Sequence, residues 1–252
     1  MKYRLLIAYD GTDYAGWQRQ DNALAVQQVV EEAVAAVVGR KVTVHGAGRT
    51  DAGVHASGQT AHLKLPAGNV PSAETRRALV QGVNHHLPAA VRVLAADAAD
   101  DSFHARNSAS FKVYSYRLCT AVVIDPFRAP FVVPAPRRID LEPMKAAAAL
   151  IAGRHDFSAF AKAGGSHRSP VRTIREARWT EQGDEIRFRV AGDGFLRGMV
   201  RALVGTMLEV GRGRRTPGDL AALLEGGPRS AAGPNAPARG LCLDSVEYDS
   251  RK

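Results

Sequence analysis

Cysteine is scarce in this sequence, and long apolar runs are absent. Cys119 and Cys242 are the only two cysteines in 252 residues, and they form no CxxC pair. This argues against a disulfide framework or a zinc site and leads us to expect a reducing cytoplasm. No apolar run reaches the ~20 residues of a membrane span, so we expect no membrane partner. The start, MKYR, leads into a strand pattern and lacks the features of a secretory signal.

Negative charge is scarce in the second part of the chain. Residues 1–104 carry 10 Lys and Arg against 10 Asp and Glu, whereas residues 105–252 carry 24 against 15. The net charge of +9 therefore lies wholly in the second part. Most of its cations are arginine, whose guanidinium binds phosphate with a fork of N–H donors. The asymmetry favours a polyanionic partner, although composition alone fits a solvated basic face equally well.

The first 104 residues alternate between strand and helix patterns. Valine and alanine recur at helical spacing over 26–37, and Gly39 follows as a stop signal. A second helix is expected from a cap at Ser72 to about residue 84. Strands are expected at 3–9, 42–46, 59–65 and 91–96. The predicted order is β-α-β-β-α-β, the ferredoxin-like arrangement.

Residues 105–252 are expected to repeat this order without any repeat in sequence. The expected strands are 109–119, a hairpin of 172–180 and 185–191 around Gly183, and 241–248. The expected helices are one with Pro143 in its first turn, one over 195–210, and a short one from Thr216-Pro217. We therefore expect an α+β protein with two ferredoxin-like (RRM-like) halves, 1–104 and 105–252. Antiparallel sheets in the two halves would flank a central RNA-binding cleft.

The segment 46–58, GAGRTDAGVHASG, is the richest in residues that could carry chemistry. Its glycines let the backbone turn tightly and approach a ligand closely. It has neither the Lys-Ser/Thr ending of a phosphate P-loop nor an opening GxGxxG after a strand. For Asp-Ala-Gly alone, a turn capped by Asp51 is the better interpretation. The neighbouring Arg49 shifts the balance towards a functional carboxylate, because a nearby cation keeps it ionised.

Several motifs resemble, in order, those of the tRNA pseudouridine synthase A (TruA) family. GRTDAGVHA, at 48–56, is similar to the active-site motif of that family. The other matches are YDGTDYAGWQRQ at 9–20, NHHLP at 84–88, FHAR at 103–106, YSY at 114–116, GRHDFSAF at 153–160, DGFLRGMVRALVG at 193–205 and PARGLCLDSVEY at 237–248. Together they span nearly the whole chain. Two departures, the loop 164–169 and Cys242, lie away from the implied chemistry and bear only on peripheral RNA contacts.

The resemblance implies roles for four residues. Asp51 corresponds to the catalytic aspartate, and Tyr114 to the tyrosine that contacts the target uracil. Arg49 resembles the residue that helps hold the flipped-out nucleotide. Arg201 resembles the arginine that pairs with the catalytic carboxylate. From pattern alone, Tyr114 would be a core aromatic on a strand and Arg201 a surface arginine on an amphipathic helix.

The resemblance also implies the reaction and its partners. It predicts isomerisation of uridine to pseudouridine at positions 38–40 of the tRNA anticodon stem-loop, by a cytoplasmic homodimer. The reaction gains and loses no atom, so neither a cofactor nor a metal is expected. His45, His55 and His62 lack metal-ligand spacing. Asp51 could act as a covalent nucleophile or as a base that removes a ribose proton, and the sequence leaves both open.

Two functions of other classes are weighed against this one. A catalytically silent RNA-binding module would show the same charge asymmetry and open sheets. The intact GRTD motif, together with Tyr114 and Arg201, argues against it. A metal-free nucleotide hydrolase could use Asp51 to release uracil, with His55 as the only obvious group to activate water. Free uracil among the products would distinguish it.

Overall fold

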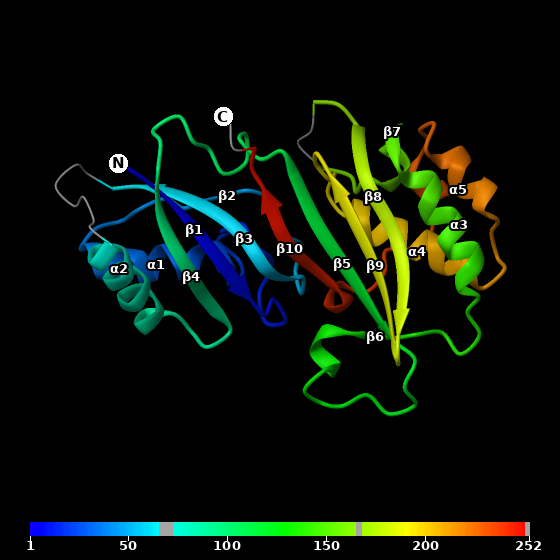
Figure 1. Cartoon of the computed structure of the whole chain (residues 1–252), viewed down its shortest axis with the longest axis horizontal. Coiled ribbons are helices and arrows are strands. Elements are labelled where there is room, and N and C mark those ends of the chain that lie inside the picture. The colour runs from blue at the N-terminus through cyan, green and yellow to red at the C-terminus, as the bar shows by residue number, and fades with distance from the viewer. Residues whose placement is uncertain (66–72, 165–167, 250–252) are drawn as a thin grey trace. The chain divides into compact units, whose positions relative to one another are not determined.

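A computed structural model describes residues 1–65, 73–164 and 168–249. Within these ranges the chain forms ten strands and five α-helices, a mixture of strands and helices that is compatible with the expected α+β class. The chain divides into two compact units: unit 1 is Met1–Ser110 with Leu243–Lys252, and unit 2 is Phe111–Cys242. The chain therefore leaves unit 1, forms unit 2, and returns to unit 1 at its end (Figure 1). The Ser72 cap and the middle of the 164–169 loop lie outside the described residues.

Unit 1 is a sheet with two helices. In chain order its elements are β1 (Lys2–Tyr9), α1 (Val26–Val38), β2 (His45–Gly46), β3 (His55–Lys64), α2 (Ala73–His86) and β4 (Val91–Ala99). Strand β1 lies between β3 and β4 and pairs antiparallel with both. The short β2 pairs with β3, and the last strand, β10 (Leu241–Glu247), is the next neighbour of β3. Helices α1 and α2 pack against each other, and α2 also contacts β4 (Figure 1).

The local sequence explains most of these elements. Along β1 every second side chain is buried, namely Tyr3, Leu5, Ile7 and Tyr9, which is the period of a half-buried strand. Helix α1 ends where Gly39 adopts φ 73° and its N–H donates to the carbonyl oxygen of Ala35, a left-handed cap that suits glycine. The predicted end of this helix at Gly39 is confirmed.

The predicted strand 42–46 is wrong for most of its length, because only His45–Gly46 pair with β3. The backbone of Val44 is bonded to side chains of helix α1 in place of a strand. Its N–H donates to Oε1 of Glu31 at 3.0 Å, and its carbonyl oxygen accepts from Nε2 of Gln27 at 2.9 Å. The apolar alternation is real, but two helix side chains take the backbone groups that a strand would need.

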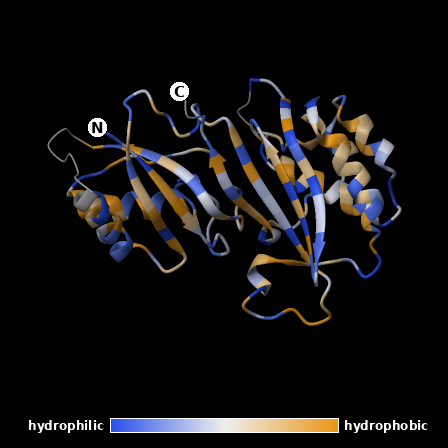
Figure 2. Cartoon of the chain, in the orientation of Figure 1, coloured by the Kyte–Doolittle hydropathy of each residue, from blue (hydrophilic) through white to orange (hydrophobic). Residues whose placement is uncertain are grey.

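Unit 2 combines a group of mainly antiparallel strands with three helices. Its elements are β5 (Phe111–Cys119), β6 (Val133–Pro134), α3 (Leu141–Ile151), β7 (Gly153–Asp156), β8 (Val171–Gln182), β9 (Glu185–Gly192), α4 (Met199–Gly211) and α5 (Pro217–Leu223). The strand order is β5-β9-β8-β7, with antiparallel pairing throughout. Helix α3 contacts β8 and both other helices (Figure 1). Figure 2 shows hydrophilic and hydrophobic stretches alternating along β8.

Capping residues set the helix bounds in unit 2. Asp140 accepts the N–H of Glu142 at the start of α3, and Thr216 forms a capping box with Asp219 at the start of α5, as the Thr-Pro pair predicts. Helix α4 begins at Met199, four residues later than the predicted 195, because Gly198 has φ 73° and this conformation cannot continue a helix. No helix in the described ranges is long and apolar enough to cross a membrane.

Candidate active site

Asp51 lies in the loop that joins β2 to β3, residues 47–54, which we call the motif loop. Asp51 is half-buried, between the buried Thr50 and the exposed Ala52. The N–H of Val54 donates to the carbonyl oxygen of Asp51 at 3.2 Å, and Gly53 has φ 74°. A positive φ at the third residue of a four-residue turn suits glycine. The GRTDAGV sequence thus forms a tight turn that starts at the aspartate.

Residues 9–20 bind the motif loop through backbone and side-chain hydrogen bonds. The N–H of Trp17 donates to the carbonyl oxygen of Thr50 at 3.2 Å, and the N–H of Gly53 donates to that of Tyr14 at 3.2 Å. The phenol oxygen of Tyr9 lies 2.9 Å from Oγ1 of Thr50 in a buried contact. Bonds on both sides of Asp51 therefore fix its backbone. Two motifs that are distant in the sequence are thus joined by hydrogen bonds.

Close packing accounts for two glycines and for Trp17 at this site. A Cβ at Gly46 would lie 2.5 Å from the indole of Trp17, which is 2% exposed. Gly16 has φ 90°, and a Cβ there would overlap the carbonyl oxygen of Thr50. The buried ring of Trp17 thus lies against Gly46, the last residue of the strand that leads into the motif loop.

His55, at the start of β3, ties the motif loop to the turn after β1. The Nδ1 atom of His55 lies 3.1 Å from the N–H nitrogen of Gly11 and 3.1 Å from Oδ1 of Asp10. A neutral ring with its proton on Nε2 accepts from Gly11, whereas a protonated Nδ1 donates to Asp10. In either state Nδ1 has a protein partner, and the ring is 4% exposed. This placement gives His55 a structural role and weakens the hydrolase alternative.

Arg49 is the exposed cation of the motif loop. Its Nε donates to Oε1 of Gln18 at 2.9 Å. Arg49 and Asp51 are thus brought together on one loop of unit 1, while Tyr114 and Arg201 belong to unit 2.

Tyr114 lies in β5 and is 6% exposed. Its ring packs edge-on against Phe195, with ring centres 5.1 Å apart and an angle of 81° between the planes. Two residues along the strand, Tyr116 is fully buried and its hydroxyl donates to the carbonyl oxygen of Pro237 at 2.9 Å. Burial raises the pKa of Tyr116 far above its ordinary value. Tyr116 is therefore a structural phenol.

Arg201 lies in the first turn of α4 and is half-buried. Its Nε donates to the carbonyl oxygen of Ala236 at 2.7 Å, and the N–H of Ala236 donates to the backbone carbonyl of Arg201 at 3.0 Å. A Cβ at Gly205, one turn further on, would overlap the carbonyl oxygen of Pro234. The loop after α5 thus lies directly on the helix and fixes the guanidinium of Arg201.

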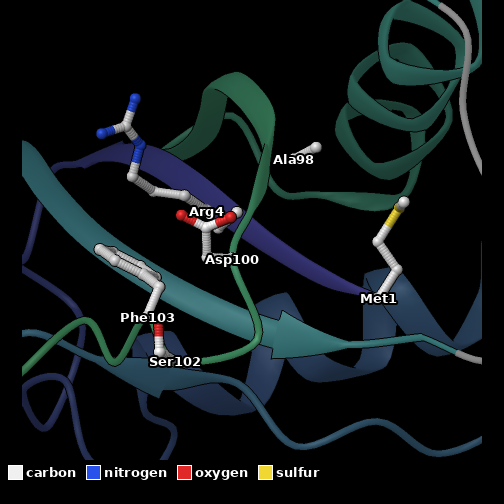
Figure 3. Close-up of a pocket in the computed structure, with 7 residues that line it drawn as sticks. Met1, Arg4, Ala98, Asp100, Ser102 and Phe103 are labelled. Carbon is white, nitrogen blue, oxygen red and sulfur yellow. The ribbon is translucent and has the colours of Figure 1, made fainter. Parts of the chain in front are cut away.

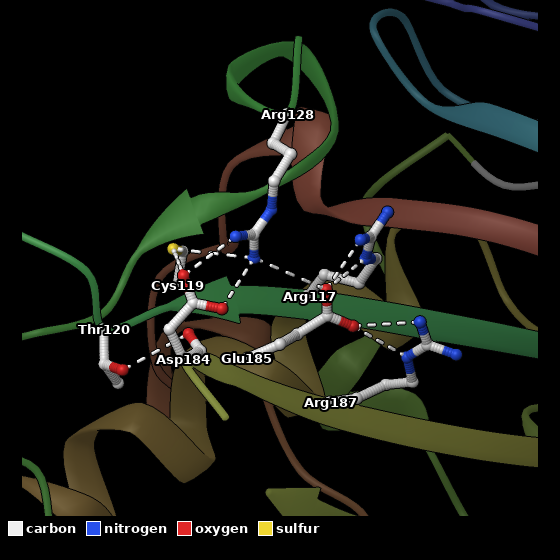
Figure 4. Close-up of polar contacts among 7 residues, drawn as sticks. All are labelled: Arg117, Cys119, Thr120, Arg128, Asp184, Glu185 and Arg187. Carbon is white, nitrogen blue, oxygen red and sulfur yellow. Dashed lines mark hydrogen bonds and ion pairs between the residues drawn. The ribbon is translucent and has the colours of Figure 1, made fainter. Parts of the chain in front are cut away.

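Arginines lie opposite one another on the strands of unit 2. Arg117 is paired in register with Arg187, and Arg178 with Arg189. Like charges in such positions repel, but a glutamate lies between the members of each pair. Glu185 accepts from Arg117 and Arg187, with its closest ion pairs at 2.6 and 2.9 Å (Figure 4). Glu176 pairs with Arg178 at 2.6 Å and with Arg189 at 3.4 Å.

The Glu185 cluster keeps a surplus positive charge, since one carboxylate faces two guanidinium groups. Burial raises the pKa of Glu185, but the hydrogen bonds from Arg117 and Arg187 outweigh it and hold the pKa below its ordinary value. Beside this cluster, Arg128 pairs with Asp184 at 2.8 Å and ties the loop after β5 to the β8–β9 turn (Figure 4). Part of the basic character of the second part therefore lies on strands β5 and β9.

A cavity of about 420 Å³ opens in unit 1, away from these residues in sequence. Its lining includes Met1, Arg4, Asp100, Ser102 and Phe103 (Figure 3). None of the four predicted site residues lines it. In the parts of the chain that the structure describes, no group of three or more His, Cys, Asp or Glu is arranged to hold a metal.

The sequence did not single out Tyr9, Gln18, Gln27 or Phe195, which hold the predicted residues in place. For one of these residues, Gln27, the sequence does hold an indication. Gln27 is a polar side chain among the buried residues of α1, beside Val26 and one turn before Val30. A polar residue inside an apolar helix face predicts a specific hydrogen-bonding role.

Comparison with known proteins identifies the family of this chain. The family model described as tRNA pseudouridine synthase matches residues 5–106 and 147–249, which include Asp51, Arg49 and Arg201. The chain therefore belongs to the tRNA pseudouridine synthase family, and the resemblance indicated by its motifs is confirmed.

Curated relatives are similar over almost their whole length. The chain is 46% identical to the tRNA pseudouridine synthase A of Syntrophotalea carbinolica, over 97% of this chain and 95% of the relative. It is 43% identical to that of Paramagnetospirillum magneticum, over 99% and 96%. It is 42% identical to that of Latilactobacillus sakei, over 98% of both chains.

Proposed function

We propose that this chain is a tRNA isomerase that converts uridine to pseudouridine at positions 38–40 of the anticodon stem-loop. The observation that carries the proposal is the near full-length similarity to proteins named tRNA pseudouridine synthase A, combined with an intact motif loop braced on both sides of Asp51. A binding module would have no need of such a fixed carboxylate.

Asp51 is the proposed catalytic residue. The reaction breaks the N1–C1′ bond of uridine and forms a C5–C1′ bond, while the proton on C5 is lost and N1 gains one. A carboxylate can assist by attacking C1′ or by removing a proton from the ribose. Both routes need the carboxylate at a defined position, and the turn at Asp51–Val54 and the bonds to Thr50 and Gly53 fix the backbone that carries it. No step requires a metal or a redox cofactor.

Tyr114, Arg49 and Arg201 are the proposed substrate-binding residues. A uracil that has left its stack needs a flat partner, and Tyr114 is an aromatic whose orientation is set by Phe195. Arg49 is exposed and offers guanidinium donors to the flipped-out nucleotide. Arg201 is held by Ala236, so its charge is placed without cost at the moment of reaction.

The partner proposed for unit 2 is the phosphate backbone of tRNA. Arg117 and Arg187 share the single carboxylate of Glu185 and give strands β5 and β9 a surplus of cations. Binding to such a surface weakens as salt rises, because phosphate contacts release counterions.

A ferredoxin-like form is proposed for both halves. For unit 1, the element order β1-α1-β2-β3-α2-β4 supports it. The central cleft, the homodimer and the cytoplasmic location stay predictions.

The test is pseudouridine formation in an unmodified tRNA with uridines at positions 38–40. The native protein is compared with Asp51→Ala and with Asp97→Ala, a matched control at an exposed aspartate paired with Arg4. We expect product at 38–40 from the native protein and the control only, with tRNA binding retained by all three. Binding without product would favour the silent module, and free uracil would favour the hydrolase. Equal product from Asp51→Ala would overturn the role of Asp51.

A further inference from the structure

A chain of side-chain hydrogen bonds connects helix α1 to the motif loop. Oε1 of Glu31 accepts from Nε2 of Gln27 at 3.1 Å. Oε1 of Gln27 accepts from Nε2 of Gln18 at 2.6 Å. Oε1 of Gln18 accepts from Nε of Arg49 at 2.9 Å. Three residues thus connect the body of unit 1 to an exposed arginine beside Asp51.

The direction of this chain is determined at both ends. An ionised carboxylate only accepts hydrogen bonds, and a guanidinium only donates them. Glu31 therefore requires the NH₂ group of Gln27, which in turn leaves the amide oxygen of Gln27 facing Gln18. The NH₂ group of Gln18 must then face Gln27, so its oxygen faces Arg49. The two amides can be oriented in only one way that satisfies all three bonds.

Further contacts fix the inner end. The NH₂ group of Gln27 also donates to the carbonyl oxygen of Val44 at 2.9 Å, and its oxygen also accepts the N–H of Arg19 at 2.9 Å. Gln27 is 7% exposed, so both ends of its amide are satisfied away from water. Gln27 is therefore held rigidly. Its hydrogen bond restricts Gln18, which in turn restricts the exposed side chain of Arg49.

The bond at the outer end has a specific consequence for Arg49. Long arginine side chains have many rotamers when they are exposed. A bond at Nε fixes the plane of the guanidinium, and it does not use the two terminal nitrogens, which carry four of the five N–H donors. These nitrogens keep the capacity to bind a phosphate or a carbonyl oxygen while the plane stays fixed.

We propose that Gln18 and Gln27 are positioning residues that orient Arg49 for the flipped-out nucleotide. This inference rests on the proposed function, since it concerns the same site. It adds a substrate-orienting role for two amides that do not themselves touch the substrate. The role predicts that the effect of changing Gln18 depends wholly on the presence of Arg49.

A double-mutant cycle tests the proposal. Gln18→Met, Arg49→Met and the double variant are assayed for kcat and KM with tRNA, alongside thermal unfolding. We expect Gln18→Met to raise KM by roughly threefold to thirtyfold, which lies within the range of coupling between contacting residues, and to leave Tm unchanged. In the Arg49→Met background, the same substitution should change neither constant. Gln28→Met is the matched control, because Gln28 makes a similar bond to Glu32 on the exposed side of α1.

Each other outcome is informative. Equal effects of Gln18→Met with and without Arg49, or an effect of the same size from Gln28→Met, would overturn the positioning role. A lowered Tm that accompanies the loss would assign Gln18 to stability alone. If the native protein forms no pseudouridine, the proposed function fails, and the cycle is then read from tRNA dissociation constants. Coupling in those constants would support the positioning of Arg49, and additivity would reject it. Gln27→Met should reproduce Gln18→Met if it folds.

Discussion

The hydroxyl of Tyr9 and the hydroxyl of Thr50 lie 2.9 Å apart in the interior of unit 1. Tyr9 is the last residue of β1, and Thr50 directly precedes Asp51. The end of a central strand is thereby joined to the residue that directly precedes the proposed catalytic aspartate. Because both side chains are buried, neither hydroxyl can exchange this bond for one with bulk water.

Tyr9→Phe should therefore weaken both stability and catalysis. We expect a loss of about 1–3 kcal/mol in the free energy of unfolding, the cost of a buried polar group that loses its partner. We expect kcat to fall by about tenfold, less than the ~100-fold that a 1 Å misplacement can cost. Denaturant unfolding and single-turnover assays measure the two effects. Adding Thr50→Val should restore part of the stability, and a loss equal to the sum of both single changes would contradict this explanation.

Gly16→Ala should destabilise the protein much more than Gly39→Ala. Both glycines have positive φ, 90° and 73°, so both substitutions carry the cost of about 1 kcal/mol for a left-handed alanine. Only at Gly16 would the new Cβ also overlap the backbone of Thr50, whereas nothing lies within 4 Å at Gly39. We expect a further 1–3 kcal/mol, on the order of an overpacked core. Similar melting temperatures for the two variants would argue against the close packing under the motif loop.

Glu185→Gln should cost stability because it leaves Arg117 opposite Arg187 without a bridging charge. The expected loss is on the order of 1–3 kcal/mol, the range for hydrogen bonds to charged groups. Glu142→Gln is the control, since Glu142 pairs with Lys145 but its side chain is 79% exposed, and such pairs contribute little. Chemical denaturation in low and high salt gives both values. A loss at Glu142 as large as that at Glu185 would refute the bridging role.

The free energy of unfolding should decrease in acid, because the unfolded chain takes up a proton at His62 more readily than the folded protein does. Burial, together with the nearby His104, His45 and Lys2, lowers the pKa of His62 from 6.5 to about 4, and its Nδ1 accepts the N–H of Ala105. Below pH 6.5 the unfolded chain therefore binds a proton that the folded protein does not. Stability is fully present above pH 6.5 and decreases towards pH 4, by up to about 3 kcal/mol.

Urea unfolding between pH 4.5 and 7.5 measures this slope. His62→Asn should flatten it, because the amide oxygen of asparagine can accept the Ala105 N–H without titrating. A remaining slope is expected from His104, whose pKa is also lowered, chiefly by burial. An unchanged pH profile in His62→Asn would assign the acid sensitivity elsewhere.

Local pattern was enough to predict the elements whose ends depend on their own residues. Gly39 ends α1 through its backbone conformation, and Thr216 starts α5 through its own side chain. Pattern failed where a distant side chain intervened. Residues 42–44 do not form a strand, because Gln27 and Glu31 bind the backbone of Val44. The same two side chains form the inner end of the chain of side-chain hydrogen bonds that reaches Arg49.

The candidate site likewise contains residues that the sequence predicts and residues that it does not. Asp51, Arg49 and Arg201 could be proposed from motifs, because the motif itself carries the chemistry. The supports of Asp51 and Arg49 could not, since Tyr9 and Gln18 act through hydrogen bonds to residues 41 and 31 positions away. Such contacts leave no local periodicity in the sequence. The two glutamates that bridge opposed arginines were hidden for the same reason, because only strand register brings the arginines together.

The return of the chain to unit 1 has a consequence for synthesis on the ribosome. Residues from Leu243 onwards belong to the unit that the first 110 residues form, and a Cβ at Gly58 in β3 would overlap the carbonyl oxygen of Asp244, so this strand lies directly against β3. Domains fold during translation as their residues emerge. The edge of β3 must therefore wait, unpaired with β10, until more than 130 further residues have been made. Unit 1, which carries Asp51, starts to emerge first and is completed last.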